Sequence, residues 1–167
     1  MSNPIPTPQQ RLTTLVNGVN DKQWTAGQLV FAAPAVETGA NNTSVAVSAA
    51  VGQVYTGNVT LRYNRVDLAE APDAASTEFS VEDGTTMTEL VPLLVERFGV
   101  DLRASDLQAQ VLPTPTVDGV EVILTAAAGS YLWHGTLAVT LKAALIPLAD
   151  VIMQTQLNGF TLEDLRL

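Results

Sequence analysis

Carboxylate side chains are the most numerous groups in this sequence that could do chemistry, and many of them gather in one stretch. From Asp67 to Asp106 the chain carries ten acidic residues, with only Arg97 and Arg103 of opposite charge. Such a cluster could bind calcium or a basic partner, but the regularly spaced oxygen ligands of an EF-hand loop are absent. We therefore interpret the stretch as a solvated acidic face.

Other residues that could act in catalysis lack suitable partners. Glu82 and Asp83 are neighbours on an expected turn, whereas paired catalytic carboxylates face each other across a cleft. His134 is the single histidine and is expected to be exposed in a hairpin loop. Arg62 and Arg65 could suggest a phosphate-binding stripe, but acidic residues follow them at once, which favours local ion pairs.

The chain contains no cysteine, which excludes disulfides, thiol catalysis and cysteine-ligated metal sites. Glycine-rich phosphate-binding motifs are also absent. The sequence therefore predicts no catalytic, cofactor-binding or metal-binding residues, and a protein that is not an enzyme. An enzyme that uses carboxylates alone is the least favoured alternative, because it would need a deep pocket lined by at least two acids.

Composition narrows the class of protein further. Hydrophobic residues make up 47% of the 167 residues and charged residues 15%, which predicts a globular domain with a real core. The net charge of −9 repels phosphate backbones and argues against a nucleic-acid partner. No apolar run approaches the roughly 18–20 residues that span a bilayer, so we expect no membrane partner. The proline-rich start, MSNPIPTPQQ, does not resemble a secretory signal.

Two short helices are expected. Residues 7–10 (TPQQ) have the types of a capped helix start, with threonine as the cap, proline in the first turn and glutamine three residues after the cap. A second helix buries Leu90 on its apolar face and ends at Gly99, a residue type favoured at left-handed C-caps. Pro92 lies inside the second pattern and predicts a later start or a kink.

Most of the other regular segments have the pattern of strands. Residues 59–63 and 77–81 alternate apolar and polar side chains, as half-buried strands do. Pro147 lies within a strand-like stretch at 145–153 and favours an edge position there. The predicted fold class is α+β, a mostly antiparallel β-sheet or sandwich covered by two short helices. Further strands are expected at residues 29–33, 45–47, 107–112, 120–125 and 136–141.

Two stretches of the chain resemble each other. Residues 45–63 and 122–141 each contain an apolar strand, the pattern Ala-Ala-x-Gly, a loop ending in an aromatic, one residue and a glycine, and a second strand. Tyr55 thereby corresponds to Trp133. This order favours an internal duplication of a helix–strand–strand–strand unit, although two hairpins also look alike because hairpins share turn chemistry. Since each half is too small to bury its sheet well, we expect both to share one core.

The domain organisation follows from these patterns. We expect a single α+β domain over residues 9–157, with repeat halves at about 9–66 and 86–145. The proline-rich residues 1–8 are predicted to form an extended N-terminal arm, and residues 158–167 a C-terminal tail. Both termini, and any unpaired sheet edge, are natural places for another chain to dock.

The chain also resembles a known group of proteins. The stretches YTGNVTLRYNRVDL (residues 55–68), VILTAAAGSYLWHGTLAVTL (122–141) and QLNGF (156–160) look like parts of small virion structural proteins of large tailed bacteriophages. The resemblance covers most of the chain, and its motifs contain no catalytic residues. It implies a non-enzymatic structural component of the phage virion, made in the host cytoplasm.

Within a virion, the resemblance implies a decoration or assembly protein that docks repetitively on other virion proteins and on copies of itself. An acidic protein fits the outer surface of the head better than a surface facing packaged DNA. The alternative is a carbohydrate- or host-surface-binding β module, because aromatic residues lie in both hairpin loops. The residues expected at interaction surfaces are Pro4, Pro6, Tyr55, Tyr131, Trp133 and Phe160.

Overall fold

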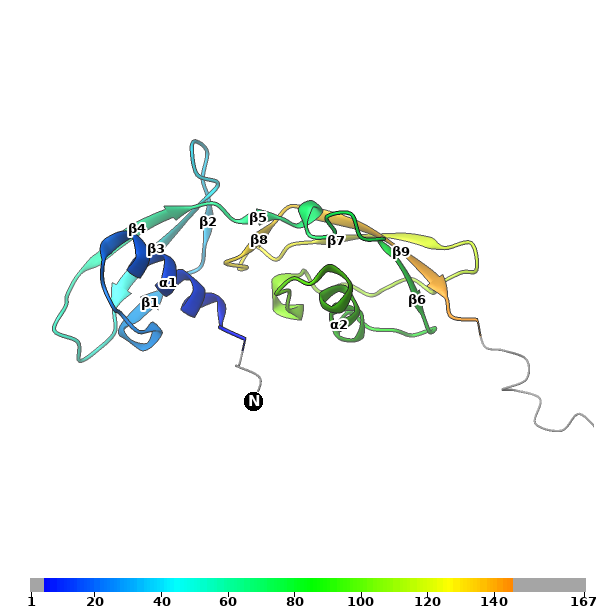
Figure 1. Ribbon diagram of the computed structural model, residues 1–167, viewed down its shortest axis with the longest axis horizontal. Coiled ribbons are helices and arrows are strands. Elements are labelled where there is room, and N and C mark those ends of the chain that lie inside the picture. The colour runs from blue at the N-terminus through cyan, green and yellow to red at the C-terminus, as the bar shows by residue number, and fades with distance from the viewer. Residues whose placement is uncertain (1–4, 146–167) are drawn as a thin grey trace, which may run out of the picture.

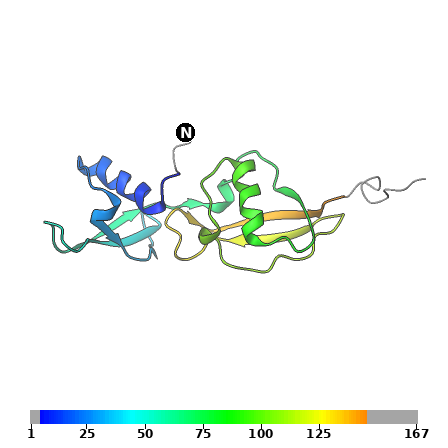
Figure 2. The same ribbon diagram turned by 90° about the horizontal axis from the view of Figure 1, so that it is seen from below.

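The computed structural model in Figure 1 describes residues 5–145. Two units, each a small sheet with a helix, follow each other along the long axis of the molecule and do not stack face to face (Figures 1 and 2). We call residues 5–65 the N-terminal half, residues 66–85 the linking segment and residues 86–145 the C-terminal half. The predicted fold class is confirmed: the protein is α+β, with mostly antiparallel sheets.

The N-terminal half begins with the predicted capped helix. The hydroxyl of Thr7 accepts a hydrogen bond from the Gln10 amide at 3.2 Å, and the Gln10 side chain accepts one from the Thr7 amide at 2.6 Å. The helix packs beside an antiparallel sheet in which β3 is central, with β1 and β2 along one edge and β4 along the other. The elements are α1 (Pro8–Asn20), the 3₁₀-helix η1 (Ala26–Gln28), β1 (Leu29–Phe31), β2 (Ala35–Val36), β3 (Thr43–Ala49) and β4 (Asn58–Tyr63).

The helix of the C-terminal half is capped in the same manner. The Thr86 amide donates to the Glu89 carboxylate at 2.8 Å, and this bond lowers the pKa of Glu89. The helix, α2 (Met87–Phe98), ends at Gly99 with a φ of 67°, as predicted. It runs through Pro92, so a start later than Thr86 is not needed: the α-helix tolerates the proline here and continues.

A three-stranded sheet packs against α2, with β9 at its centre. Strand β9 pairs antiparallel with β7 on one side and parallel with β6 on the other. A two-residue parallel pair, β5 with β8, connects the linking segment to the C-terminal half. The elements are β5 (Val66–Asp67), η2 (Leu68–Glu70), β6 (Glu78–Val81), η3 (Ala104–Asp106), β7 (Val120–Thr125), β8 (Trp133–His134) and β9 (Thr136–Ala143).

The strand expected at residues 107–112 is wrong. Leu107 forms an isolated bridge with Ala126, and the Gln108 amide donates to the Thr125 carbonyl at 2.8 Å, but no further pairing follows. An apolar run without a neighbouring strand to bond has no reason to stay extended in a ladder. The expected edge strand at 145–153 lies outside the described residues apart from Leu145.

The two halves repeat the same hydrogen bonds around their 3₁₀-helices. The Ala50 amide donates to the carbonyl of Gln28 at 2.9 Å, and the Ala127 amide donates to the carbonyl of Asp106 at 2.7 Å. The side chains agree as well: Gln28 bonds to Gln53 at 3.3 Å, and Asp106 accepts from Ser130 at 2.6 Å. The sequence resemblance therefore corresponds to a repeated three-dimensional framework.

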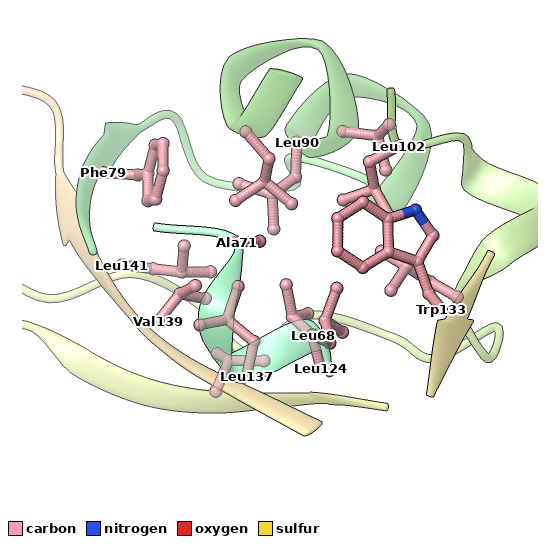
Figure 3. Close-up of a cluster of buried hydrophobic side chains, with 14 of the residues drawn as sticks. Leu68, Ala71, Phe79, Leu90, Leu102, Leu124, Trp133, Leu137, Val139 and Leu141 are labelled. Atoms are coloured by element: carbon pink, nitrogen blue, oxygen red, sulfur yellow. The ribbon is translucent and has the colours of Figure 1, made fainter. Parts of the chain in front are cut away.

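We expected from the sequence that the two halves share one core, but they do not. The large cluster of buried apolar side chains lies entirely within residues 68–141 (Figure 3). The linking segment supplies Leu68, Ala71, Phe79 and Val81 to that cluster, which completes the C-terminal half. Among described residues of the N-terminal half, the buried apolar side chains are Leu12, Val45 and Val47.

Candidate interaction surface

An apolar groove of about 240 Å³ lies on the N-terminal half, between the end of α1 and the β3–β4 hairpin. Strand β4 forms one wall, and no described strand pairs with the outer edge of β4. The groove therefore combines exposed apolar side chains with unpaired backbone groups, the two features that favour docking of another segment. The large apolar side chains that line it are Val16, Trp24, Leu29, Val47, Tyr55, Val59 and Leu61.

The groove lies where the C-terminal half has a filled core. Tyr55 and Val59 are 53% and 59% exposed, whereas their counterparts Trp133 and Leu137 are 6% and 5% exposed. In the C-terminal half, Leu68 of the linking segment lies among Leu137 and the neighbouring core side chains (Figure 3). No described residue takes the place of Leu68 in the N-terminal half, so its groove is open.

The aromatic residues predicted to lie at interaction surfaces divide into two groups. Tyr55 is exposed and packs edge to face on Trp24, with ring centroids 6.2 Å apart. Trp133 is buried, and its indole N–H donates to the Asp101 carbonyl at 3.0 Å. The expectation of an exposed loop position is therefore wrong for Trp133, because the ring packs in the core cluster that contains Leu68 and Leu102.

Tyr131 and Tyr63 lie at the junction between the halves. The Tyr131 hydroxyl donates to the Ala32 carbonyl at 3.0 Å, and the Tyr63 hydroxyl donates to the Tyr131 carbonyl at 3.0 Å. Burial raises the pKa of Tyr63 to about 12, with Arg65 opposing and Tyr131 adding to that rise. Tyr131 thus holds the two halves together instead of presenting a free aromatic face.

Arg65 also belongs to the junction. Its guanidinium is buried and donates to the Thr43 hydroxyl at 2.8 Å and to the Ser130 carbonyl at 3.0 Å. Arg62 lies 3.6 Å from Glu37 in an exposed ion pair. The ion pairs that we expected with the acidic residues just after Arg65 are therefore not those that form.

The N-terminal arm is shorter than predicted within the described residues, because α1 already begins at Pro8. Pro6 lies against the C-terminal half, where its carbonyl accepts a hydrogen bond from Arg103 at 2.7 Å. Arg11 and Asp101 form a second link between the halves, with a nitrogen–oxygen distance of 2.8 Å. Pro4 and Phe160 lie outside the described residues.

The acidic stretch is largely a solvated face, since seven of its ten carboxylate residues are exposed. Asp67 and Asp101 are half-buried, and Asp106 is buried and accepts bonds from the Ser130 hydroxyl and the Arg103 amide. Within residues 5–145, no group of three or more potential ligands could hold a metal ion.

His134 is half-buried in β8, not exposed in a loop. No helix in the same range is long and apolar enough to cross a bilayer.

Sequence reasoning missed the groove itself. Trp24 and Val59 were not among the expected interaction residues, although Val59 belongs to an alternating strand. The alternation showed which side chains of β4 share a face, but the exposure of that face depends on whether a separate segment covers it. The sequence offered one sign of the groove: the two repeats have different aromatic residues at the equivalent position, Tyr55 in the first and Trp133 in the second.

Comparison with known proteins identifies a family. Residues 3–164 match the family of unknown function DUF7941, so the chain belongs to that family. No curated protein and no solved structure matches it.

Proposed function

We propose that this member of the DUF7941 family is a non-enzymatic structural component of a tailed-bacteriophage virion. In this proposal the protein is a decoration or assembly element that docks repetitively on neighbouring virion proteins. Its outer acidic face points to solvent, and its open sheet edge and apolar groove point to neighbours. The resemblance to small phage virion proteins gives the setting of the proposal.

The proposal rests on the open apolar groove of the N-terminal half and on the unpaired outer edge of β4. Tyr55 and Val59 are more than half exposed, and Val59 belongs to the edge strand β4, whose outer edge no described strand pairs with. Contiguous apolar surface beside an open edge is costly for an isolated protein and useful in an assembly. Permanent interfaces are rich in apolar surface of this kind.

Uptake onto phage particles tests this role. Particles made without the protein would be mixed with the purified chain and sedimented, and we expect the chain to co-sediment at a fixed ratio to the major shell or tail protein. A control variant, Val111→Asp, changes a side chain of the C-terminal half that is 95% exposed and does not line the groove, and should be taken up equally well. A chain that stays in the supernatant at saturating concentration would contradict a virion role.

The arm hypothesis has its own test within this experiment. Removing residues 1–8 would also delete the Thr7 cap and the Pro6 contact with Arg103, so removing residues 1–4 isolates the arm better. We expect weaker uptake of the shortened chain with unchanged circular dichroism. Equal uptake of both chains would show that the arm has no role in docking.

A carbohydrate- or host-surface-binding module is the second candidate, and one observation favours it. Tyr55 and Trp24 form an accessible aromatic pair in the groove, and aromatic faces are the usual stacking platforms for sugars. On a glycan array, this candidate predicts binding that is lost in Tyr55→Ala. Trp133→Ala does not test it, because Trp133 is buried in the core.

A further inference from the structure

The C-terminal half is completed by chain that comes from outside it. The linking segment pairs β5 with β8, inserts Leu68 into the core and covers the edge of β9 with β6. Figure 3 shows Leu68 among Leu124, Leu137 and Trp133. Without this segment, the C-terminal half would have an apolar groove and an open strand edge.

The N-terminal half has that groove and that edge. The counterparts of Leu124, Leu137 and Trp133 are Val47, Val59 and Tyr55, and all three line the groove. The groove is therefore the vacant equivalent of the place that Leu68 occupies. A suitable occupant is a segment like the linking segment, with an apolar residue in the position of Leu68.

The sequence contains such a segment directly after the C-terminal half. Leu29 and Leu107, and likewise Gly57 and Gly135, are related by a spacing of 78 residues (107 − 29 and 135 − 57). The same spacing from Leu68 leads to Ile146 (68 + 78). Residues 146–157 read IPLADVIMQTQL, with Asp150 as the single charged residue, which is a composition suited to burial against an apolar groove.

The groove that this segment would fill belongs to a different molecule. In the linking segment, Val66 pairs with β8 only three residues after β4 ends at Tyr63. A segment that follows β9 in the same way must find its groove close to the end of β9. In Figure 1 that end lies on the right and the groove-bearing hairpin β3–β4 lies on the left, so the nearby groove must come from a second copy.

We propose that residues 146–157 of one copy fill the apolar groove of a second copy and extend the sheet along β4, joining copies head to tail. Residues 146–157 of each copy then complete the N-terminal half of the next copy, as the linking segment completes the C-terminal half. The contact is heterologous, since the docking tail (residues 146–157, called the tail below) and the groove are different surfaces. Repetition therefore yields a closed ring or an open filament. This assembly does not depend on the virion role and can be tested without phage particles.

Two single substitutions in the full-length chain separate tail from groove. Ile146→Asp places a charge on the tail, and Val59→Asp places one in the groove at a side chain that is 59% exposed. By sedimentation velocity over a range of concentrations, we expect the wild type to form oligomers. Each variant alone should be monomeric, with the dissociation constant raised by at least about 100-fold. Val111→Asp is the matched control and should assemble like the wild type.

Mixing the two variants gives the decisive result. Ile146→Asp retains an intact groove and Val59→Asp an intact tail, so an equimolar mixture has one productive contact and should form a one-to-one heterodimer that grows no further. A mixture that remains monomeric, variants that assemble as well as the wild type, or a wild type that is monomeric at every concentration would each overturn the proposal.

The absence of native cysteine allows a direct check of which chain fills the groove. The double variant Val59→Cys/Ile146→Cys should form a ladder of covalently joined chains on a denaturing gel under oxidising conditions. A single band of monomer mass with an internal disulfide would show that the tail folds back on its own groove. That result would overturn the head-to-tail contact.

Discussion

Strands β4 and β9 occupy equivalent places in the two halves, yet their inward side chains lie in very different surroundings. Leu137, Val139 and Leu141 of β9 are 5%, 1% and 0% exposed. On β4 the equivalent Val59 is 59% exposed. The alternation of side chains is the same in both strands, so the difference comes from what packs on them: Leu68 and Phe79 of the linking segment, with side chains of α2, join the cluster on β9. Whether a side chain of these strands is buried therefore depends on the segments packed against the strand as much as on the strand's own sequence.

The largest expected difference in stability between equivalent substitutions in the two halves is at the aromatic positions Trp133 and Tyr55. Trp133→Ala should lower the free energy of unfolding by about 3–5 kcal/mol, because it empties a filled core and removes the indole bond to Asp101. Tyr55→Ala, at the equivalent position, should cost less than about 1 kcal/mol, because the side chain is already half exposed. Urea unfolding followed by circular dichroism measures both values. Similar costs at the two sites would mean that the N-terminal half is also covered in solution.

A smaller contrast is expected at the paired loop glycines. Gly57 and Gly135 have φ values of 92° and 77°, so alanine at either site costs roughly 1–2 kcal/mol in backbone strain. At Gly135 the added methyl group would also collide with the carboxylate of Asp67, whereas the space around Gly57 is empty. We therefore expect Gly135→Ala to cost at least about 1 kcal/mol more than Gly57→Ala, because Asp67 must give up its bond to the Ala69 amide.

Thermal unfolding of the two glycine variants, side by side, tests this difference. Equal shifts in melting temperature would show that Asp67 moves aside without cost, and that β5 is less firmly held than its pairing with β8 indicates.

The smallest effect concerns the junction that joins the two halves. Because burial raises the pKa of Tyr63 to about 12, the folded protein favours its neutral form. The stability from this preference is fully present below about pH 10 and is lost as pH rises toward 12, since the unfolded chain loses the proton first. Urea midpoints between about pH 9 and about pH 11.5 should therefore fall less steeply for Tyr63→Phe than for the wild type.

Local features of the fold were readable from the sequence. The caps at Thr7 and Gly99, and the alternation in β6, β7 and β9, follow from rules that act over a few residues. The repeat was readable because its glycines and aromatics keep their order. These are features in which a residue and its partner are close along the chain.

The features that sequence reasoning missed depend on distant partners. The two-residue pair of β5 with β8 joins residues on different sides of the junction and leaves no periodic pattern. Trp133 and Tyr55 follow similar strand and loop patterns, and what distinguishes the buried ring from the exposed one is the set of distant residues packed around Trp133, among them Leu68 and Leu102. The buried Arg65 was likewise unexpected, because its partners, the Thr43 hydroxyl and the Ser130 carbonyl, lie far from it in the chain.

The bonds of Arg65, together with the other links across the junction, also restrict the angle at which one half meets the other. A guanidinium that donates to fixed groups on both sides leaves little freedom for the halves to rotate. In any array built from such units, a small change in that angle is added at every step, so it determines the curvature and pitch of the whole. Buried contacts within one copy, Arg65 among them, would thereby help to select between a closed circle and a continuous helix.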